Sequence, residues 1–348
     1  LMKVLGHVQS VVERRNTIPV LSNVKFDAQS ESLSLNSTDM DIDIVETVPA
    51  AVETSGSTTA PAHTLFDIVR QLPEGSQVEL DNTEDSQNLV LNSGRSKFTL
   101  SCLPTEDFPV LSGDELPHNF ELPAKALRTL IDRTKFAIST EETRYYLNGI
   151  YIHVSDVDGT TKLRAVATDG HRLAKVEVDC PQGAESMPGV IVPRKAVTEL
   201  RKLAEEFGEN IRVSVSDTRI RFSFDGVVFT TKLIDGTFPD YGRVIPTGND
   251  KVLEVNTSDF SEAVSRVSAI SSDKSRAIKL GLTAGNLLLS VISTENGSAV
   301  EELGVDYSAD GVEIGFNSRY LLDITQQIEG DLARFTLADS GSPTLVQD

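Results

Sequence analysis

The residues best placed to do chemistry lie in one short stretch, Thr168-Asp-Gly-His-Arg-Leu173. It combines a hydroxyl, a carboxylate, an imidazole and a guanidinium. His171 lies two residues from Asp169, so the two are a candidate for a general base and its orienting acid. Two residues apart at the tip of a hairpin is a poor geometry for that role, because the two side chains would not face each other. A hydrolase built on His171 and Asp169 is therefore the least favoured function for this chain.

Other catalytic and metal-binding patterns are missing from the sequence. It has no phosphate-binding glycine loop, no His-Glu-x-x-His and no Gly-x-Ser-x-Gly. Asp39, Asp41 and Asp43 alternate with apolar residues, which favours a strand with one solvated face over a metal site. The two cysteines, Cys102 and Cys180, belong to no paired ligand motif. We therefore expect no metal and no cofactor, and a binding or scaffold protein rather than an enzyme.

The stretch around His171 must be held by a pair of strands. An apolar, β-branched run leads into Thr168, and another apolar run leaves from Leu173. Asp169-Gly170 offers the positive φ that a two-residue hairpin needs. The sequence therefore predicts strand, tight turn and strand, and a plain structural hairpin is the alternative to a functional one.

The same order of elements occurs three times in the chain. Each copy begins with an amphipathic helix that runs into an aliphatic strand, at 122–139, at 255–271 and, cut short, from residue 1. A strand ending in a Thr-acid or Thr-amide turn follows, and then a second helix and strand. The turns begin at Thr38, Thr168 and Thr294, which are 130 and 126 residues apart. The sequence thus predicts three divergent copies of one domain.

We expect the domains to span residues 1–117, 118–246 and 247–348, with the third copy ending before its last strands. The boundaries are placed in segments rich in Pro, Gly and Asp near 112–118 and 246–250. Two helices and many short strands in each copy predict an α+β fold, with the helices packed on antiparallel sheets. Three copies of this size fit an arc, or a ring completed by a second chain.

Composition and charge limit the remaining functions. No apolar run is long enough to cross a bilayer and no export signal is evident, so we expect a soluble, cytoplasmic protein. The net charge of −20 argues against binding nucleic acid with the whole surface. The predicted helices (1–16, 63–72, 124–139, 193–207, 257–276 and 318–328) nevertheless hold 16 basic and 10 acidic residues, against 32 − 16 = 16 and 52 − 10 = 42 elsewhere. This indicates either ordinary solvated helices or a basic helical face that meets phosphates.

Three motifs in this order resemble a known family: Arg144-Tyr-Tyr-Leu-Asn-Gly149, Ala167-Thr-Asp-Gly-His-Arg-Leu173 and Phe238-Pro-Asp-Tyr241. They are similar to the β subunits, or sliding clamps, of bacterial DNA polymerase III, and the similarity extends over essentially the whole chain. The resemblance implies a non-catalytic processivity factor, in which a head-to-tail homodimer forms a closed ring of six domains around duplex DNA. The ring tethers the polymerase and so raises its effective concentration at the primer end.

The resemblance also implies roles for particular residues. A pocket between the second and third domains would bind short linear peptides from polymerases, the clamp loader and mismatch-repair proteins, with Leu173, Pro239 and Val244 forming its apolar floor and Arg144, His171 and Arg172 donating at its rim. The pocket residues are Arg144, Leu147, Thr168, Gly170, His171, Arg172, Leu173, Pro239, Arg243, Val244, Asn317 and Tyr320. The DNA-facing residues are Arg15, Lys125, Arg128, Lys135 and Lys195.

This sequence departs from the family pattern at Gly341 and Pro343, where larger or hydroxyl residues are common. We therefore expect the wall of the peptide pocket to have a different shape there. In the ring contact, Ile68, Leu72 and Phe108 of one chain would pack against Ala269 and Ile270 of the other. The alternative is that these five are ordinary core residues. The alternative function is an acidic three-repeat scaffold that binds other proteins without DNA.

Overall fold

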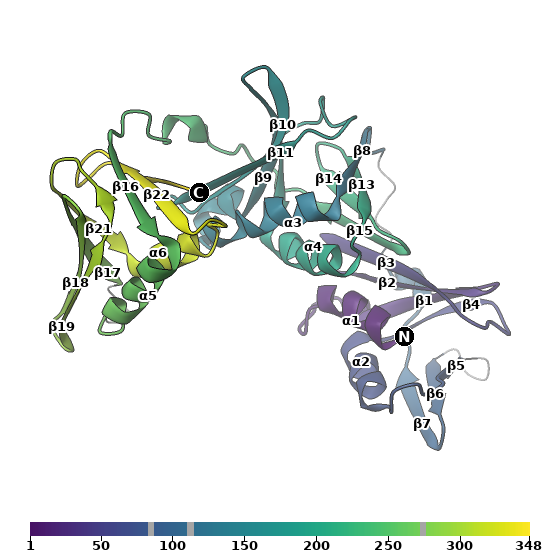
Figure 1. Cartoon of the computed structure of the whole chain (residues 1–348). Helices are drawn as coiled ribbons and strands as arrows, with labels where there is room; N and C mark the ends of the chain where they lie inside the picture. Colours follow the sequence, from purple (N-terminus) through teal and green to yellow (C-terminus); the bar gives the residue numbers. More distant parts are fainter. Residues whose placement is uncertain (83–86, 110–114, 272–275) are drawn as a thin grey trace. The chain divides into compact units, whose positions relative to one another are not determined.

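The computed structural model of the chain describes residues 1–82, 87–109, 115–271 and 276–348 (Figure 1). These residues form two compact units, Leu1–Phe238 and Pro239–Asp348. The first unit contains two copies of the repeat and the second contains the third copy. The expected boundary segment at 112–118 and the last residues of the helix expected at 257–276 lie partly outside the described ranges.

One continuous antiparallel sheet joins the first two repeats (Figure 1). Its strands, in spatial order, are β4 (Gly56–Pro61), β1 (Asn23–Gln29), β2 (Ser32–Thr38), β3 (Ile42–Pro49), β15 (Val227–Lys232), β14 (Arg219–Ser223), β13 (Asn210–Val215) and β8 (His118–Pro123). The seam between repeats is the pair β3–β15, where Val45 lies opposite Val228 and Asp43 opposite Thr230. The first two repeats therefore share one hydrogen-bonded layer.

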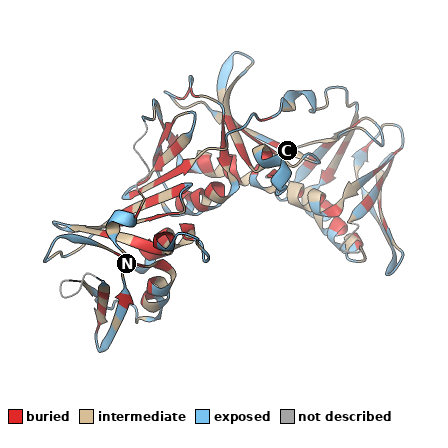
Figure 2. Ribbon diagram, turned by 180° about the vertical axis from the view of Figure 1, so that it is seen from behind, coloured by how far each residue is buried: buried red, intermediate tan, exposed pale blue. Residues whose placement is uncertain are grey.

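The described residues of the first unit form four helices, α1 (Met2–Val11), α2 (Ala62–Gln71), α3 (Ala124–Asp132) and α4 (Arg194–Glu206), of which α1 packs on β2 and β3 of this sheet. They contact each other in the order α2, α1, α4 and α3. Each buries an apolar stripe, as α3 does with Leu127, Leu130 and Ile131. The buried residues of both repeats belong to one core, and they concentrate where helices meet strands (Figure 2).

Two smaller sheets complete the first unit. One has the order β11 (Leu173–Asp179), β10 (Thr160–Thr168), β9 (Gly149–Val157) and β12 (Val190–Pro193), and the other consists of β5 (Glu79–Asp81), β6 (Asn88–Ser93) and β7 (Ser96–Ser101). Short 3-10 turns include η3 (Lys135–Ala137) and η4 (Glu142–Leu147).

The second unit repeats this plan. One sheet has the order β20 (Asp306–Tyr307), β16 (Lys251–Asn256), β22 (Leu332–Leu337) and β23 (Leu345–Gln347). The other has the order β19 (Gly297–Gly304), β18 (Asn286–Ser293), β17 (Ala277–Thr283) and β21 (Val312–Asn317). Helices α5 (Thr257–Ser268) and α6 (Ser318–Thr325) bury their apolar faces in a second core, in which the Phe260 and Phe335 rings lie 5.2 Å apart.

The α+β architecture of three similar domains is confirmed, but several element ends differ from the prediction. Helix α3 ends at Asp132 and not near 139, because the Thr134 hydroxyl donates to Leu130 O (2.6 Å) and a 3-10 turn follows. The aliphatic strands predicted at 136–139 and 268–271 are absent from these described segments, which form helix ends and turns. The β10–β11 connection has four residues and not two, since Thr168 pairs with Leu173.

Candidate functional site

The turn between β10 and β11 is held by its own side chains. The Thr168 hydroxyl donates to Arg172 O (2.7 Å) and accepts from Gly170 N–H (3.1 Å). Asp169 Oδ1 accepts from the backbone N–H groups of His171 (2.9 Å) and Arg172 (3.0 Å). Gly170 takes the positive φ of 86° that the turn requires. These bonds fix the backbone and leave the His171 side chain exposed.

The first repeat builds the same turn between β2 and β3. The Thr38 hydroxyl donates to Ile42 O (2.7 Å) and accepts from Met40 N–H (3.1 Å), while Asp39 Oδ1 accepts from Asp41 N–H (2.9 Å) and Ile42 N–H (2.6 Å). The turn thus belongs to the repeat, and the His-Arg-Leu sequence is what distinguishes the middle copy. The acidic run with Asp39, Asp41 and Asp43 was expected to be one strand. Only its last part, from Ile42 onward, belongs to β3.

Arg172, which was predicted to be a rim donor, makes several contacts within its own chain. Its Nε donates to Asp169 Oδ2 (3.1 Å), its Nη2 donates to Phe136 O (2.6 Å), and the guanidinium carbon lies 5.1 Å from the centre of the Phe136 ring. The side chain is only 13% exposed. This arginine therefore fastens the turn to η3, which is a structural role that the sequence alone did not indicate.

The other residues predicted from this unit surround the turn. Gly170 lies against Arg144, because a Cβ at Gly170 would come within 2.5 Å of Arg144 Nη1. Arg144 is exposed at the surface and forms an ion pair with Glu141 (3.3 Å). Leu173 is half-buried, whereas Leu147 is buried with 4% exposure. The structure thus brings Arg144, Gly170, His171 and Leu173 together at one surface.

The remaining pocket residues lie in the second unit. Pro239 is exposed and Val244 is 59% exposed, while Arg243 forms an ion pair with Asp240 (2.8 Å). The Asn317 carboxamide oxygen caps α6 by accepting from Arg319 N–H (3.0 Å). Tyr320 is half-buried on α6. Val244 is a large apolar side chain left in solvent, which suits a binding surface.

The two departures from the family pattern lie in a turn closed by Asp339. Its carboxylate accepts from Gly341 N–H (2.8 Å), Ser342 N–H (2.8 Å) and the Ser342 hydroxyl (2.9 Å). These hydrogen bonds lower the pKa of Asp339, and the bond from Gly341 N–H has the largest effect. Pro343 O accepts from Asn249 (3.0 Å).

The predicted DNA-facing cations differ in how free they are. Arg15 and Lys125 are exposed and have no ion-pair partner among the described residues. Arg128 donates to Ala204 O on α4 (3.3 Å), and Lys135 pairs with Asp132 (2.5 Å). The basic excess is also smaller than predicted, because the six described helices hold ten Lys or Arg and eight Asp or Glu. Arg15 and Lys135 instead follow the ends of α1 and α3, where a positive charge is favoured.

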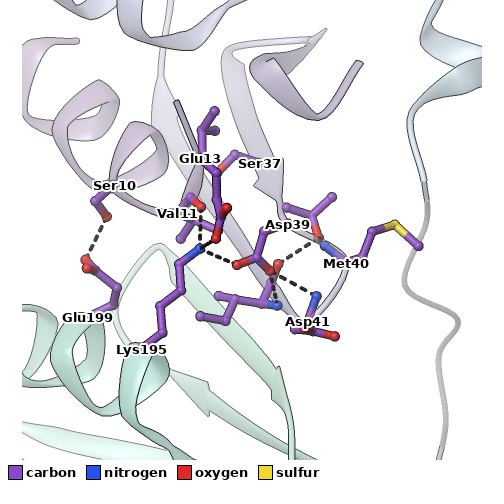
Figure 3. Close-up of polar contacts among 12 residues, drawn as sticks. Ser10, Val11, Glu13, Ser37, Asp39, Met40, Asp41, Lys195 and Glu199 are labelled. Atoms are coloured by element: carbon purple, nitrogen blue, oxygen red, sulfur yellow. Dashed lines mark hydrogen bonds and ion pairs between the residues drawn. The ribbon is translucent and has the colours of Figure 1, made fainter. Parts of the chain in front are cut away.

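Lys195 lies between the first two repeats (Figure 3). Its ammonium donates to Asp39 Oδ2 (2.5 Å), Glu13 Oε1 (3.0 Å) and Val11 O (3.1 Å). Burial disfavours the charge, but Asp39 and Glu13 outweigh it and raise the pKa of Lys195. Beside it, the Ser10 hydroxyl of α1 donates to Glu199 of α4 (2.7 Å). Lys195 thus has its charge compensated inside the chain.

A second polar link between these repeats is centred on His7 of α1. Its Nδ1 lies 2.7 Å from Glu46 of β3, and its Nε2 lies 2.8 Å from Glu206 of α4, which also pairs with Lys3. Burial acts against the imidazolium, but the two carboxylates prevail and raise its pKa. No local motif marks this site, because the partners are 39 and 199 residues away.

The residues proposed for the ring contact have different exposures. Phe108 is buried within its own unit (4% exposed), as the core alternative expects. Ile68 and Leu72 are half-buried against the first core, and Ile270 is half-buried against the second. Ala269 is exposed at the end of α5.

The site offers no catalytic pairing of His171 with Asp169. The Asp169 carboxylate is occupied by two backbone N–H groups and Arg172, so it does not orient the imidazole. In the part of the chain that the structure describes, no group of three or more His, Cys, Asp or Glu side chains could hold a metal ion. Nor is any helix of these residues long and apolar enough to span a membrane.

Comparison with known families gives matches over nearly the whole chain. Residues 1–112 match the model of the N-terminal domain of the DNA polymerase III beta subunit. Residues 121–240 match the model of its central domain, and residues 242–348 match that of its C-terminal domain.

Individual relatives are similar along their length. The beta sliding clamp of Caulobacter vibrioides is 53% identical over 348 residues, covering 100% of this chain and 94% of the relative. The beta sliding clamp of Escherichia coli K12 is 37% identical, covering 100% of this chain and 93% of the relative.

Solved structures agree with this similarity. The sliding clamp of Bartonella birtlesii bound to griselimycin has 51% identity and a TM-score of 0.97, covering 100% of this chain and 93% of that one. The beta sliding clamp of Caulobacter crescentus has 52% identity and a TM-score of 0.98, covering 100% and 92%.

Proposed function

Because the chain belongs to the family of DNA polymerase III β subunits, we propose that it acts as a DNA sliding clamp, the processivity factor of the replicative polymerase. The observation that carries this proposal is that all three domains of the family follow one another in the chain. The single sheet shared by the first two domains supports it, since such a layer makes them one stiff segment. The acidic scaffold without DNA gains no support from these relatives.

In the mechanism we propose, two chains close head to tail around duplex DNA. A closed ring holds DNA by topology, so the contacts with phosphates need only be weak, and an acidic protein can slide. Arg15 and Lys125 are exposed cations suited to such contacts. The chain itself performs no chemistry in this mechanism, and it works in the cytoplasm where the DNA is replicated.

The tethering function requires a site for the polymerase. We propose that the surface around the β10–β11 turn binds linear peptides of polymerases, the clamp loader and mismatch-repair proteins, and the resemblance to the family adds the predicted residues of the second unit to this role. Leu173 and Val244 offer apolar contact, while Arg144, His171 and the Asn317 Nδ2 group can donate hydrogen bonds. Arg172 supports this surface by fastening the turn to η3.

Retention on DNA tests the proposed function. The chain, loaded by a clamp loader onto nicked circular DNA, should stay bound through gel filtration and should be released when the circle is cut. The Arg15→Ala, Lys125→Ala double variant should be retained less well at moderate salt, because fewer phosphates are neutralised. Equal retention on linear and circular DNA would contradict a topological link and favour the scaffold.

A further inference from the structure

Strand β8 forms an edge of the eight-stranded sheet, and a hollow lies beside it. The hollow has a volume of about 720 Å³ and is lined by β8, by Ala126 of α3 and by the end of β11 with the residues that follow it. Its apolar lining includes Leu122, Val178 and Pro181. None of the residues assigned above to the peptide pocket lines it.

The backbone of β8 has free groups on this side. Ala124 N–H donates to Glu209 O (2.8 Å), and Leu122 lies opposite Ile211 in β13. In an antiparallel pair, alternate residues direct their backbone groups to the neighbouring strand, so Glu121 directs its N–H and C=O outward. An edge of this kind can pair with another extended segment.

The third repeat shows what can fill such an edge. There β16 takes the place of β8, and its outer side pairs with β20, where Asp306 lies opposite Glu254 and Tyr307 opposite Leu253. Tyr307 is 3% exposed and its hydroxyl donates to Asp310 O. The chain thus fills this edge in the third repeat with an extended segment and one buried aromatic ring.

Glu121 and Glu254 hold equivalent positions. Each lies three residues before the first residue of its helix, Ala124 or Thr257. Each also lies opposite an arginine, since Glu121 faces Arg212 and Glu254 faces Arg334.

The second repeat cannot fill its own edge in this way. After β11 the chain continues as Cys180-Pro-Gln-Gly183, in which Pro181 has no N–H to donate. Gly183 has a φ of 96° and crosses close to β8, because a Cβ there would lie 2.5 Å from Asn119 O. The segment therefore turns across one end of β8, and no described residue pairs with the outward backbone groups of Glu121.

We propose that the edge of β8 is a second docking site, which binds an extended peptide of a partner protein by strand addition. The peptide has the pattern of Val305-Asp-Tyr307, with its aromatic side chain in the hollow. In the register of the third repeat its acidic residue lies opposite Glu121, as Asp306 lies opposite Glu254. Arg212 faces Glu121 from β13, is exposed and has no ion-pair partner in the described part of the chain, so its charge offsets the two neighbouring carboxylates.

The test uses a fluorescein-labelled synthetic peptide with the sequence of residues 303–310. We expect saturable fluorescence anisotropy with the full chain, and slower alkylation of Cys180, which lines the hollow. Cys102 lies in the first repeat and is the internal reference. A peptide with Ala in place of Tyr should bind at least roughly tenfold more weakly, because its aromatic anchor is gone.

Variants of the chain separate backbone pairing from side-chain contact. Glu121→Pro removes the outward N–H but no bond to β13, so binding should weaken about tenfold. Glu121→Thr keeps the N–H and should change binding less than about twofold. Ala126→Trp fills the hollow and should abolish binding. This variant still tests the proposal if Glu121→Pro fails to fold.

Two results would overturn the proposal. One is the absence of any anisotropy change up to about 1 mM peptide, a concentration at which even a weak site is half filled. The other is binding that survives both Glu121→Pro and Ala126→Trp, or that leaves Cys180 as reactive as before. Leu173→Asp, at the β10–β11 turn, should leave this binding intact; loss there would mean that the peptide uses the other surface.

Discussion

At the scale of single residues, His7 links protonation to the contact between two repeats. It is packed against the Phe207 ring (5.9 Å) and faces Glu46 of β3 and Glu206 of α4, and Lys3 of α1 pairs with the same Glu206. The pKa of His7 is raised in the folded chain, so its stabilising effect is complete below the unfolded pKa of about 6.5 and is lost as the pH rises through the folded pKa.

We therefore predict that His7→Gln lowers the free energy of unfolding by roughly 1–2 kcal/mol at pH 6 and by less at pH 9. Urea unfolding at a series of pH values measures the difference. His63→Gln is the matched control, because the His63 ring bonds to the backbone at Val12 O (3.0 Å) and to no carboxylate among the described residues. A pH-independent loss in His7→Gln would mean that the imidazole acts only by packing.

Arg172 and His171 are neighbours with opposite predicted effects. Arg172→Ala removes the guanidinium bonds to Asp169 Oδ2 and Phe136 O, while Asp169 Oδ1 keeps its two backbone N–H donors. It should lower the free energy of unfolding by about 2–3 kcal/mol. His171→Ala should change stability by less than about 0.5 kcal/mol, since its side chain is exposed, yet weaken binding of a polymerase-derived peptide. Denaturation and fluorescence anisotropy on both variants check this.

The sequence predicted the turn at Thr168 but not the roles within it. Thr, Asp and Gly act on residues two to four positions away, so their hydrogen bonds follow from local spacing. Arg172 bonds to Phe136 O, 36 residues away, and His7 to Glu206, 199 residues away. Those contacts depend on how the elements pack, and no local pattern encodes them.

At the scale of elements, the turn between β2 and β3 is fastened to α4 by Lys195. Lys195→Met would leave Asp39, whose side chain is 10% exposed, without its cation. We predict a loss of about 1–3 kcal/mol in the free energy of unfolding, because a buried charge would lose its partner. Lys125→Met removes an exposed cation and is the matched control, with little expected change.

The two variants also separate structural from DNA-binding cations. At a temperature where both are folded, Lys125→Met should reduce retention on circular DNA more than Lys195→Met does. A larger loss of retention in Lys195→Met than in Lys125→Met would indicate that Lys195 belongs to the DNA-facing surface. Circular dichroism establishes that both variants are folded before retention is compared.

The helices were predicted better than their ends and better than the pairing of distant strands. Apolar spacing located the six α-helices of the described residues, since each buries one apolar stripe, but it placed their ends too late. The ends depend on single bonds such as that from the Thr134 hydroxyl to Leu130 O. The β3–β15 seam joins strands about 185 residues apart, as Asp43 opposite Thr230 shows, and strand pairing at such a distance leaves no periodicity in the sequence.

At the scale of the whole molecule, the proposed ring predicts a mass of twice 37.8 kDa in solution. The contact residues proposed for it are a mixture, because Phe108 is buried in its own chain and Ala269 is exposed. Leu72→Asp would disturb the first core as well as the contact, since Leu72 packs against that core. Ala269 is the cleaner position for a test.

We predict that Ala269→Asp gives a monomer of 37.8 kDa by sedimentation equilibrium. A charge placed in an apolar contact must be desolvated without a partner, which costs several kcal/mol in each of the ring's two contacts. Thermal unfolding of the isolated chain should be unchanged, because the side chain is exposed. Ala284→Asp, at another exposed position in the same unit, should remain a dimer. A dimeric Ala269→Asp variant would mean that the contact between chains lies elsewhere. A monomer that also loses retention on circular DNA would show that the ring is needed for the tethering function.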